Sequence, residues 1–420
     1  MSYYGLLGEH LSHSYSPLIH SMLGDYDYRL IEKSPNELEE FLTSSDNKFS
    51  GLNVTIPYKT AVIPYCKDLS GNAKNIGSVN TIIRQQDGSL YGENTDFYGF
   101  SYLLETQRHN LFDGKILILG NGGSSLTVQA VLKTCQGDGS FDRFGNPVII
   151  SRTGENNYEN IDKHNDAVMI INTTPIGMYP NNEASPIEDL SIFKNCKAVI
   201  DLIYNPHRTK LLLQAEELNI PCNGGLPMLV AQAKKASELF TGRAIPDEIV
   251  NEITQSVKTQ TQNIILIGMP GCGKSTVGKE LATKLGREFA DTDEWVEHKA
   301  GKSIPTIFSE SGEAAFRKLE NEALEELCKQ SGLVIATGGG IVKRAENRDI
   351  IKQNGFVIFL DRDIKDLPTE GRPLSQKEGI EELAAERLPL YKKWSDFSVT
   401  VQGIYETMNK IINVSIEPSP

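Results

Sequence analysis

The sequence has few cysteines, and none lies close to another. The six cysteines stand at positions 66, 135, 196, 222, 272 and 328, at least 26 residues apart. There is no CxxC pair and no Cys/His cluster, so neither a disulfide framework nor a zinc site is indicated. We therefore expect reduced thiols.

Long hydrophobic runs are missing as well. No apolar run approaches the 18 residues that a membrane helix needs, and the mean hydropathy is −0.30. The first five residues, Met1–Gly5, show neither the basic nor the apolar region of a signal peptide. These absences predict a soluble, cytoplasmic protein, and a length of 420 residues predicts two to four domains.

Positive charge is in deficit. The chain has 42 Lys and Arg against 55 Asp and Glu, a net charge of −13, which divides into −9 over residues 1–262 and −4 over residues 263–420. Acidity spread in this way argues against nucleic acid or an anionic membrane as a partner. A small anionic substrate needs only a few cations in one cleft, so local basic clusters are the features to find.

Two glycine-rich turns organise the chain. Each follows a short apolar run and precedes a helical pattern, which is typical of a nucleotide-binding unit; the turns cover residues 120–125 and 268–276. Between them, residues 254–263 (TQSVKTQTQN) are polar and predict a short linker, with a boundary near residue 260.

β-Branched runs alternate with helical patterns over the whole length, which predicts an α/β protein with mainly parallel sheets. The expected strands are 148–150, 167–171, 198–203, 333–336 and 356–360. The clearest expected helices are 126–133, 209–218, 226–240 and 313–328.

The second turn satisfies the P-loop pattern and stands in the right context of strand and helix. The glycines let backbone N–H groups point at phosphate oxygens, Lys274 reaches the terminal phosphates, and the Ser275 hydroxyl can ligate Mg²⁺. The pattern predicts a site for ATP and Mg²⁺ formed by Gly271, Cys272, Gly273, Lys274, Ser275 and Thr276.

Four polar motifs follow the P-loop. In order, they are Asp291-Thr292-Asp293, Phe316-Arg317-Lys318-Leu319-Glu320, Thr337-Gly338-Gly339-Gly340 and Arg387-x3-Tyr391. Two arginines and bare glycine amides suit a small carboxylate, and an aspartate suits hydroxyls. Each motif alone also has a purely structural interpretation, such as a polar strand end or a solvated pair on a helix. Together with Gly371-Arg372-Pro373-Leu374 and the P-loop, they resemble shikimate kinase over residues 263–420.

This resemblance implies roles for particular residues. Arg372 resembles the lid arginine that closes on the phosphates, and Asp293 orients or deprotonates the attacking hydroxyl. Ser275 ligates Mg²⁺, and Asp291 helps to hold the Mg²⁺ shell through water. Shikimate is expected to bind to Asp293, Arg317, Gly339, Gly340 and Arg387. The segment between Asp361 and Arg372 is shorter than is usual in the family, which leaves the adenine contacts and the lid kinetics open.

The first turn indicates a dinucleotide. Residues Gly120, Asn121, Gly122, Gly123 and Ser124 supply two of the three fingerprint glycines, which is a weak signal alone. The next expected strand ends in Ser151, Arg152 and Thr153 and not in an acidic residue. An acidic side chain there would accept from the ribose of NAD, whereas an arginine pairs with the 2′-phosphate of NADP. We expect NADP(H).

Residues before and after this turn suggest a substrate site. The segments His13–Pro17, Gly51–Lys59, Gly77–Thr81 and Gly92–Asp96 supply hydroxyls, amides, one lysine and one aspartate, which suits a polyol ring with a carboxylate. Individually they also fit ordinary turns, a surface lysine and a helix cap.

With Asn172–Met178, Asp201–Pro206 and Gly224–Leu229, the same segments resemble shikimate dehydrogenase over residues 1 to about 258. The resemblance makes Lys59 and Asp96 the catalytic pair. It assigns substrate binding to Ser14, Ser16, Thr55, Asn80, Tyr204 and Gln232.

Three features depart from that family. Asn156 stands where a second basic residue is usual, which leaves open how strongly the chain prefers NADP to NAD. Pro227 replaces a glycine near the nicotinamide and removes a backbone donor. Residues 136–146 resemble an insertion, which we expect to be an exposed loop.

The two resemblances converge on one pathway and predict a fused bifunctional enzyme with two small-molecule substrates, 3-dehydroshikimate and shikimate. The expected architecture is a substrate domain (1–100 with 226–258), a Rossmann NADP domain (101–225), a linker region (259–262) and a P-loop kinase domain (263–420). Two alternatives remain: a binding protein that has lost catalysis, and a dehydrogenase for quinate with NAD. Oligomeric state and channelling are open.

Overall fold

The computed structural model describes residues 2–11, 14–44, 46–106, 114–137, 147–367 and 379–416. Contacts divide the chain into two compact units: Met1–Tyr204 with Gln214–Val257, and Asn205–Leu213 with Lys258–Pro420. Helices and three sheets, two of them wholly parallel, confirm the α/β class. Within the described ranges, no helix has both the length and the apolar character needed to cross a membrane.

The first sheet of unit 1 has six strands in the order β2-β1-β3-β5-β6-β4. β1 runs parallel to β2 and β3, and β5 is antiparallel to both β3 and β6. Gly51 brings a helix close to the sheet, because a Cβ there would come within 2.5 Å of the Phe240 ring. The strands are β1 (Tyr3–Gly8), β2 (Tyr28–Glu32), β3 (Phe49–Val54), β4 (Asp68–Leu69), β5 (Thr81–Arg84) and β6 (Leu90–Glu93).

The helices of this part come from both ends of unit 1. They are α1 (Ser16–Leu23), α2 (Leu38–Thr43), α3 (Gly71–Ile76), α4 (Asp96–Thr106), α7 (Leu226–Thr241) and α8 (Glu248–Thr261). The polar segment that we expected as a linker is largely helical, since α8 covers residues 254–261. α8 is amphipathic, and its apolar residues Val250, Ile253 and Val257 pack into one core with Ile19 of α1 and Val230 of α7.

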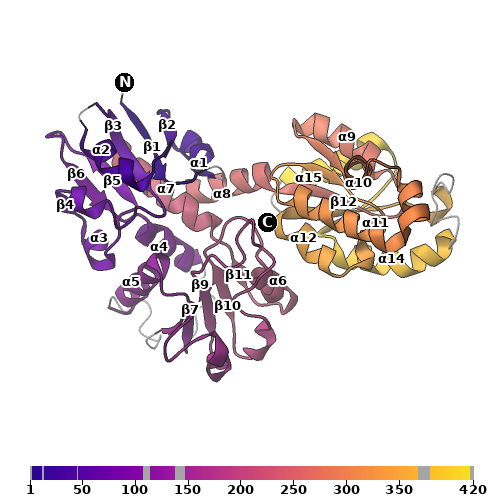
Figure 1. Cartoon of the computed structure of the whole chain (residues 1–420), viewed down its shortest axis with the longest axis horizontal. Coiled ribbons are helices and arrows are strands. Elements are labelled where there is room, and N and C mark those ends of the chain that lie inside the picture. Colours follow the sequence, from indigo (N-terminus) through magenta and orange to yellow (C-terminus); the bar gives the residue numbers. More distant parts are fainter. Residues whose placement is uncertain are drawn as a thin grey trace. The chain divides into compact units, whose positions relative to one another are not determined.

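The second sheet of unit 1 is parallel throughout, in the order β11-β10-β9-β7-β8 (Figure 1). Its elements are β7 (Ile116–Leu119), α5 (Gly123–Gly137), β8 (Val148–Ile150), β9 (Met169–Asn172), β10 (Ala198–Asp201), α6 (Lys210–Glu217) and β11 (Cys222–Asn223). Strand order reverses at β7, so the glycine turn after β7 opens into the crevice where such sheets bind ligands. Most of the expected insertion, residues 138–146, lies outside the described residues.

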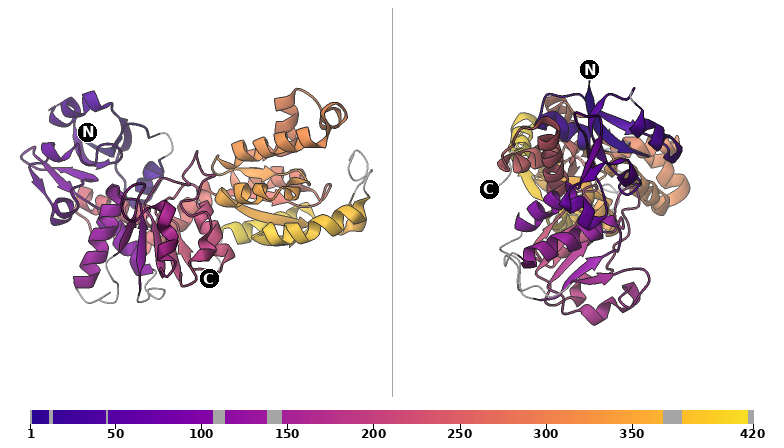
Figure 2. Two further views of the ribbon diagram at one scale, coloured as in Figure 1. Left: turned by 60° about the horizontal axis from the view of Figure 1, so that its bottom comes forward. Right: turned by 90° about the vertical axis from the view of Figure 1, so that its left-hand side faces the viewer.

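Unit 2 is built on a five-stranded parallel sheet in the order β13-β14-β12-β15-β16. Its strands are β12 (Asn263–Ile267), β13 (Phe289–Asp291), β14 (Val334–Ala336), β15 (Gly355–Asp361) and β16 (Phe397–Thr400). Helices cover both faces of this sheet (Figure 2). The P-loop follows the central strand β12. The motifs at Asp291–Asp293 and Thr337–Gly340 follow β13 and β14, at the same edge of the sheet.

The helices of unit 2 are α9 (Lys274–Leu285), α10 (Thr292–Ala300), α11 (Ile304–Cys328), α12 (Glu346–Asn354), α14 (Ile380–Trp394) and α15 (Ile404–Ile416). α11 begins nine residues before the helix that we expected. Gly312 interrupts it with φ 78° and ψ 173°, so the expected start at Glu313 coincides with the second segment of α11. The expected lid, including Arg372, lies outside the described residues.

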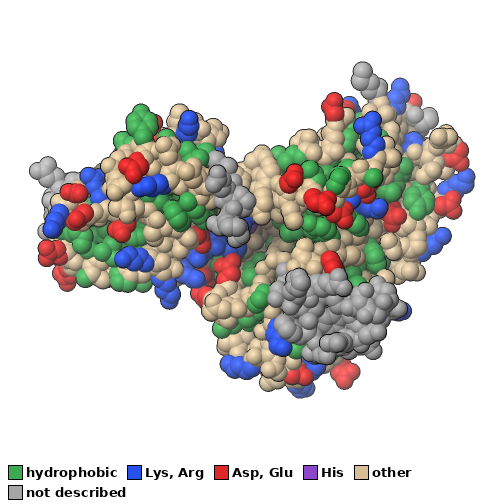
Figure 3. Space-filling model, turned by 180° about the vertical axis from the view of Figure 1, so that it is seen from behind, with side chains coloured by type: hydrophobic (Ala, Val, Ile, Leu, Met, Phe, Trp, Pro, Cys, Tyr) green, Lys and Arg blue, Asp and Glu red, His purple; other side chains and the backbone are tan. Residues whose placement is uncertain are grey.

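Charged side chains of both signs are mixed over the described surface of the face drawn in Figure 3. No described group of three or more His, Cys, Asp and Glu side chains is arranged to hold a metal ion.

Candidate active sites

A cavity in unit 1 gathers side chains from widely separated segments. Its lining includes every substrate or catalytic residue expected for the dehydrogenase half, namely Ser14, Ser16, Thr55, Lys59, Asn80, Asp96, Tyr204 and Gln232. Ser124 and Thr127 of α5 line the same cavity, which brings the glycine turn and the substrate residues to one place.

Lys59 and Asp96 form an ion pair in this cavity. Lys59 Nζ donates to Asp96 Oδ2 at 2.6 Å, and both side chains are only partly exposed. Asp96 is the first residue of α4, where the helix dipole favours a carboxylate. Lys59 lies in the turns after β3, and its carbonyl accepts from Val79 N at 2.8 Å. The pair is thus held from two elements, with a cation and an anion facing one ligand space.

Hydroxyl groups line another part of the cavity. Ser16 opens α1, and its backbone N–H donates to Ser14 Oγ at 3.2 Å. Tyr204 is partly buried and packs against Tyr15, with ring centroids 5.4 Å apart. Burial raises the pKa of the Tyr204 phenol, so this group remains a neutral hydroxyl that can donate or accept.

The side-chain amides of Asn80 and Gln232, which we expected to bind substrate, are held by Thr95, a residue to which we had assigned no role. Thr95 N donates to Asn80 Oδ1 at 2.6 Å, and Thr95 Oγ1 donates to Gln232 Oε1 at 3.3 Å. Asn53 lines the cavity and donates to Thr81 Oγ1 at 3.2 Å. Asn53 and Thr95 lie inside the motifs quoted for the resemblance, and that position was the available signal.

The glycine turn fits a dinucleotide phosphate. Gly120 has φ 104°, and a Cβ there would lie 2.9 Å from Thr173 Oγ1, so glycine is required. Gly122 and Gly123 have open space around them, and α5 begins at Gly123. Exposed amides at a helix start bind phosphate, and the absence of side chains lets a ligand approach the backbone closely.

The expected 2′-phosphate site follows β8. Arg152 is exposed in a turn that Ser151 N closes by donating to Asn156 O at 3.2 Å. Asn156 Oδ1 lies 3.0 Å from His164 Nε2, so this side chain is engaged within the loop. Pro227 lies in the first turn of α7, where the helix itself needs no N–H from it.

A second cavity, of about 550 Å³, lies in unit 2 at the carboxyl edge of the sheet. This volume is within the usual range for small-molecule sites. Its lining includes the expected residues Gly271, Gly273, Lys274, Ser275, Thr276, Asp291, Asp293, Arg317, Gly339, Gly340 and Arg387. Cys272 is buried beneath the loop, with Sγ 3.8 Å from Lys274 Nζ.

The P-loop has the backbone that phosphate binding requires. Gly271 and Gly273 have φ 82° and 103°, in the region that favours glycine. Lys274 opens α9, and its Nζ donates to Gly268 O at 2.9 Å and to Met269 O at 3.0 Å. The ammonium is held over the loop, where it can turn to a phosphate.

Ser275 and Asp291 form the candidate Mg²⁺ site. Ser275 Oγ donates to Asp291 Oδ2 at 2.6 Å, and Asp291 Oδ1 accepts from Asp293 N at 2.9 Å. One hydroxyl and one carboxylate, completed by phosphate oxygens and water, is a donor set that Mg²⁺ prefers. The residues therefore fit this cation.

Asp293 lies in the same cavity with an altered acidity. Burial and then the nearby carboxylates of Asp291 and Glu320 raise its pKa to about 7, although Lys274 and Arg317 oppose the shift. A carboxyl group with this pKa can gain and lose a proton near neutral pH, as a general base must.

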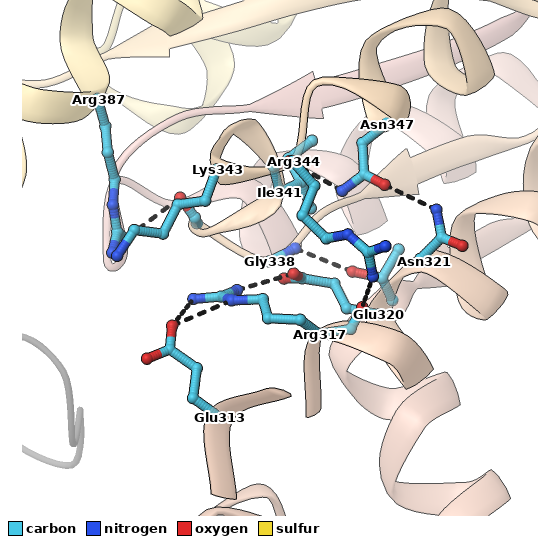
Figure 4. Close-up of polar contacts among 12 residues, drawn as sticks. Glu313, Arg317, Glu320, Asn321, Gly338, Ile341, Lys343, Arg344, Asn347 and Arg387 are labelled. Carbon is cyan, nitrogen blue, oxygen red and sulfur yellow. Dashed lines mark hydrogen bonds and ion pairs between the residues drawn. The ribbon is translucent and has the colours of Figure 1, made fainter. Parts of the chain in front are cut away.

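Two arginines converge on the cavity from α11 and α14 (Figure 4). Arg317 Nη1 donates to Glu320 Oε2 at 2.7 Å, and Arg317 also contacts Glu313. A Cβ at Gly340 would overlap the Arg317 guanidinium, so glycine there allows the arginine to lie against the backbone. Arg387 is 1% exposed, and its Nη1 donates to Gly339 O at 3.3 Å.

Comparison with known proteins identifies a family for each part of the chain. The shikimate kinase family model matches residues 270–415, and the model for the shikimate dehydrogenase substrate binding domain matches residues 6–82. A shikimate dehydrogenase (NADP(+)) of Clostridium beijerinckii is 36% identical over 281 residues, which cover 63% of this chain and 99% of that protein. A shikimate kinase of Thioalkalivibrio sulfidiphilus is 44% identical over 163 residues, which cover 37% of this chain and 85% of that protein.

A solved structure supports the fold of the first part. Shikimate 5-dehydrogenase from Thermus thermophilus, in complex with NADP(H) and shikimate, superimposes with a TM-score of 0.53 and 27% identity, covering 61% of this chain and 99% of that one. The two expected resemblances are thus confirmed. The chain belongs to the shikimate dehydrogenase family in its N-terminal part and to the shikimate kinase family in its C-terminal part.

Proposed function

We propose that the chain reduces 3-dehydroshikimate to shikimate with NADPH, and that it phosphorylates shikimate with ATP and Mg²⁺ to shikimate 3-phosphate. The observation that carries the proposal is that each cavity joins the phosphate-binding turn of its half to the substrate residues of the same half. The product of the first reaction is the substrate of the second.

Reduction needs a proton donor at the substrate oxygen. NADPH supplies the hydride to the ketone carbon when it is bound, and negative charge develops on the oxygen. Lys59 stabilises that charge and delivers the proton, while Asp96 fixes Lys59 and binds the resulting hydroxyl. Ser14 and Ser16 hold the substrate carboxylate, and Asn80 and Gln232 hold ring hydroxyls.

Phosphoryl transfer needs alignment and charge neutralisation more than covalent chemistry. Lys274 and the P-loop amides hold the phosphates, and Ser275 and Asp291 would hold Mg²⁺, which neutralises phosphate charge when it is bound. Asp293 orients the attacking hydroxyl and accepts its proton. Arg317, Arg387 and the backbone of Gly339 and Gly340 bind the shikimate carboxylate and ring. The resemblance assigns Arg372, which lies outside the described residues, to the phosphates.

The domain limits that follow are a substrate domain of residues 1–100 with 226–258, a Rossmann domain of 101–225 and a kinase domain of 263–420. NADP binds to Gly120–Ser124, with Ser151, Arg152 and Thr153 around the 2′-phosphate. The exposed Arg152 supports NADP over NAD, because it supplies a cation where an acidic side chain would accept from a free ribose.

The test supplies 3-dehydroshikimate with NADPH or NADH, with and without ATP and Mg²⁺. Nicotinamide absorbance follows reduction, and ADP release follows phosphorylation. We expect oxidation of NADPH in preference to NADH, and ADP release from 3-dehydroshikimate only when a reduced nicotinamide is also present. Reduction without ADP release, even from added shikimate, would contradict the kinase assignment, and equal rates with NADH would contradict the cofactor assignment.

A further inference from the structure

The guanidinium of Arg317 lies between two carboxylates of its own helix, those of Glu313 and Glu320 (Figure 4). The two partners differ in exposure. The side chain of Glu320 is 1% exposed, and that of Glu313 is 42% exposed, although the Arg317 side chain that joins them is 9% exposed. One partner is therefore fixed in the core and the other lies at the surface.

Glu313 uses the edge of Arg317 that suits a ligand carboxylate. Arg317 Nε donates to Glu313 Oε1 at 3.2 Å, and Arg317 Nη2 donates to the same oxygen at 3.0 Å. Two parallel N–H groups on one edge match the two oxygens of a carboxylate. In this structure one oxygen, Glu313 Oε1, accepts both bonds. A ligand carboxylate that used both of its oxygens would match this edge better.

Glu313 can leave this edge without disturbing the rest of the site. It is the first residue after the interruption of α11 at Gly312, and its side chain already reaches water. Glu320 would keep its bond to Arg317 Nη1, and Gly340 would keep the guanidinium against the backbone. The buried cation therefore retains one partner when the other departs.

A second cation in the same cavity has room for an anion. Arg387 Nη2 is buried and has no hydrogen-bond partner in the part of the chain that the structure describes, and Arg387 Nε lies 3.8 Å from Glu386 Oε2, beyond hydrogen-bond distance. An incoming carboxylate gains this second arginine, which Glu313 does not contact. That gain favours the ligand in an exchange of partners at Arg317.

We propose that Glu313 is a specificity-determining residue of the kinase site, and that the substrate carboxylate displaces it from Arg317. Binding then exchanges one carboxylate for another, and a ligand without a carboxylate cannot complete the exchange. Glu313 occupies the Nε and Nη2 edge of Arg317 while the site is empty, and it thereby lowers the affinity for substrate. The inference rests on the proposed phosphorylation of shikimate.

The test compares Glu313→Gln and Glu313→Ala with the wild-type chain. Both variants remove the competing charge and should lower KM for shikimate by about two- to fivefold, the range for loss of a partly exposed ion pair. The kcat and the KM for ATP should stay unchanged. Glu310→Gln is the matched control, because Glu310 lies on α11 and pairs only at the surface, with Lys302 at 2.6 Å.

An increase in KM for shikimate in the Ala variant would overturn the proposal, because it would mean that Glu313 holds Arg317 in place for the substrate. An unchanged KM would overturn it as well. The wild-type chain is assayed first with shikimate, ATP and Mg²⁺. If it releases no ADP, the proposed function fails. If it releases ADP but the Glu313 variants keep the wild-type KM for shikimate, only the proposal for Glu313 fails.

Discussion

Lys59 gives a direct test of a single side chain in the dehydrogenase site. Lys59→Met keeps much of the aliphatic stem and removes the ammonium that donates to Asp96 at 2.6 Å. Without a proton donor at the substrate oxygen, kcat for reduction should fall by about 10²- to 10⁴-fold. Absorbance of NADPH with 3-dehydroshikimate measures this loss, and phosphorylation of added shikimate should continue at the wild-type rate.

Lys67 supplies the control for that substitution. It belongs to the same unit and pairs with Asp87 at the surface, where its side chain is 63% exposed. Lys67→Met should reduce 3-dehydroshikimate normally. If both variants lost the same fraction of activity, the effect of Lys59 would be one of general charge or folding, and its catalytic assignment would be wrong.

The raised pKa of Asp293 should appear in the stability of the protein. Between pH 4 and pH 7, the folded carboxyl group keeps a proton that the unfolded one has lost, because its folded pKa is about 7. Folding then takes up a proton, so this group makes stability fall as pH rises through that window. Asp293→Asn removes the titration and should stabilise the protein at pH 8 by on the order of a few kcal/mol.

Fluorescence can follow this unfolding selectively. The chain has two tryptophans, Trp295 and Trp394, and both belong to the kinase half. Urea unfolding in metal-free buffer at pH 5 and pH 8 should therefore show a pH-dependent difference between Asp293→Asn and wild type. Glu294→Gln, which changes an exposed neighbour on α10 that pairs with Lys279 at the surface, is the matched control. A constant difference between the two pH values would contradict the raised pKa.

Single residues were predictable from the sequence where a local motif carries the chemistry. Lys274, Ser275 and Asp293 lie in short motifs, and the structure brings all three to the lining of one cavity. Asn53 and Thr95 are different, because their partners Thr81 and Gln232 are 28 and 137 residues away and meet them only through sheet pairing and helix packing. No local pattern reveals such contacts, and the same holds for the cavity that joins Ser16 to Thr127.

At the scale of elements, the buried parallel strands were the most predictable. β8 has the expected limits, and β9, β10, β14 and β15 differ from expectation by only one or two residues at an end. They were predictable because a continuous apolar run marks a strand that is covered on both faces. The segment that became the end of α8 was misleading. Its composition is polar, but Val257 continues the apolar stripe that Val250 and Ile253 form on α8. This stripe packs against α1 and α7.

The turn after β14 offers a test at this scale. Gly340 has φ −97° and ψ 0°, a conformation open to alanine, so glycine is needed there only because Arg317 lies against its backbone. Gly340→Ala should leave the fold intact and push the guanidinium away from its position. We expect KM for shikimate to rise by about tenfold or more, as loss of a charged hydrogen-bond partner does. The KM for ATP should not change.

Gly403→Ala is the matched control, since a Cβ at Gly403 meets nothing within 4 Å and its φ is not positive. Both variants should unfold at the wild-type urea concentration. If Gly340→Ala had a normal KM for shikimate, Arg317 would not bind substrate in the position that it occupies here. That result would also remove the basis for a role of Glu313.

At the scale of the whole molecule, the acidic charge and the anionic substrates are compatible. A net charge of −13 weakens attraction for extended polyanions. Arg317 and Arg387 instead place two cations in one cavity of unit 2, where they suit a small anion. The sequence could predict this division of labour because the basic motifs are local. It could not predict whether one chain gains anything by carrying both sites.

A mixture of two full-length variants, each lacking one of the two activities, can decide that question. Lys59→Met chains should phosphorylate but not reduce, and Lys274→Ala chains should reduce but not phosphorylate, because Lys274 is the P-loop cation. If shikimate diffuses freely, an equal mixture of the two variants should convert 3-dehydroshikimate to shikimate 3-phosphate as fast as wild type at the same concentration of intact sites. Sharing a chain raises only the effective concentration, and a product that escapes by diffusion gains little from it.

ADP release after addition of 3-dehydroshikimate and NADPH measures both the lag and the final rate. A longer lag in the mixture than in wild type would contradict free diffusion and show that shikimate passes between the sites of one chain.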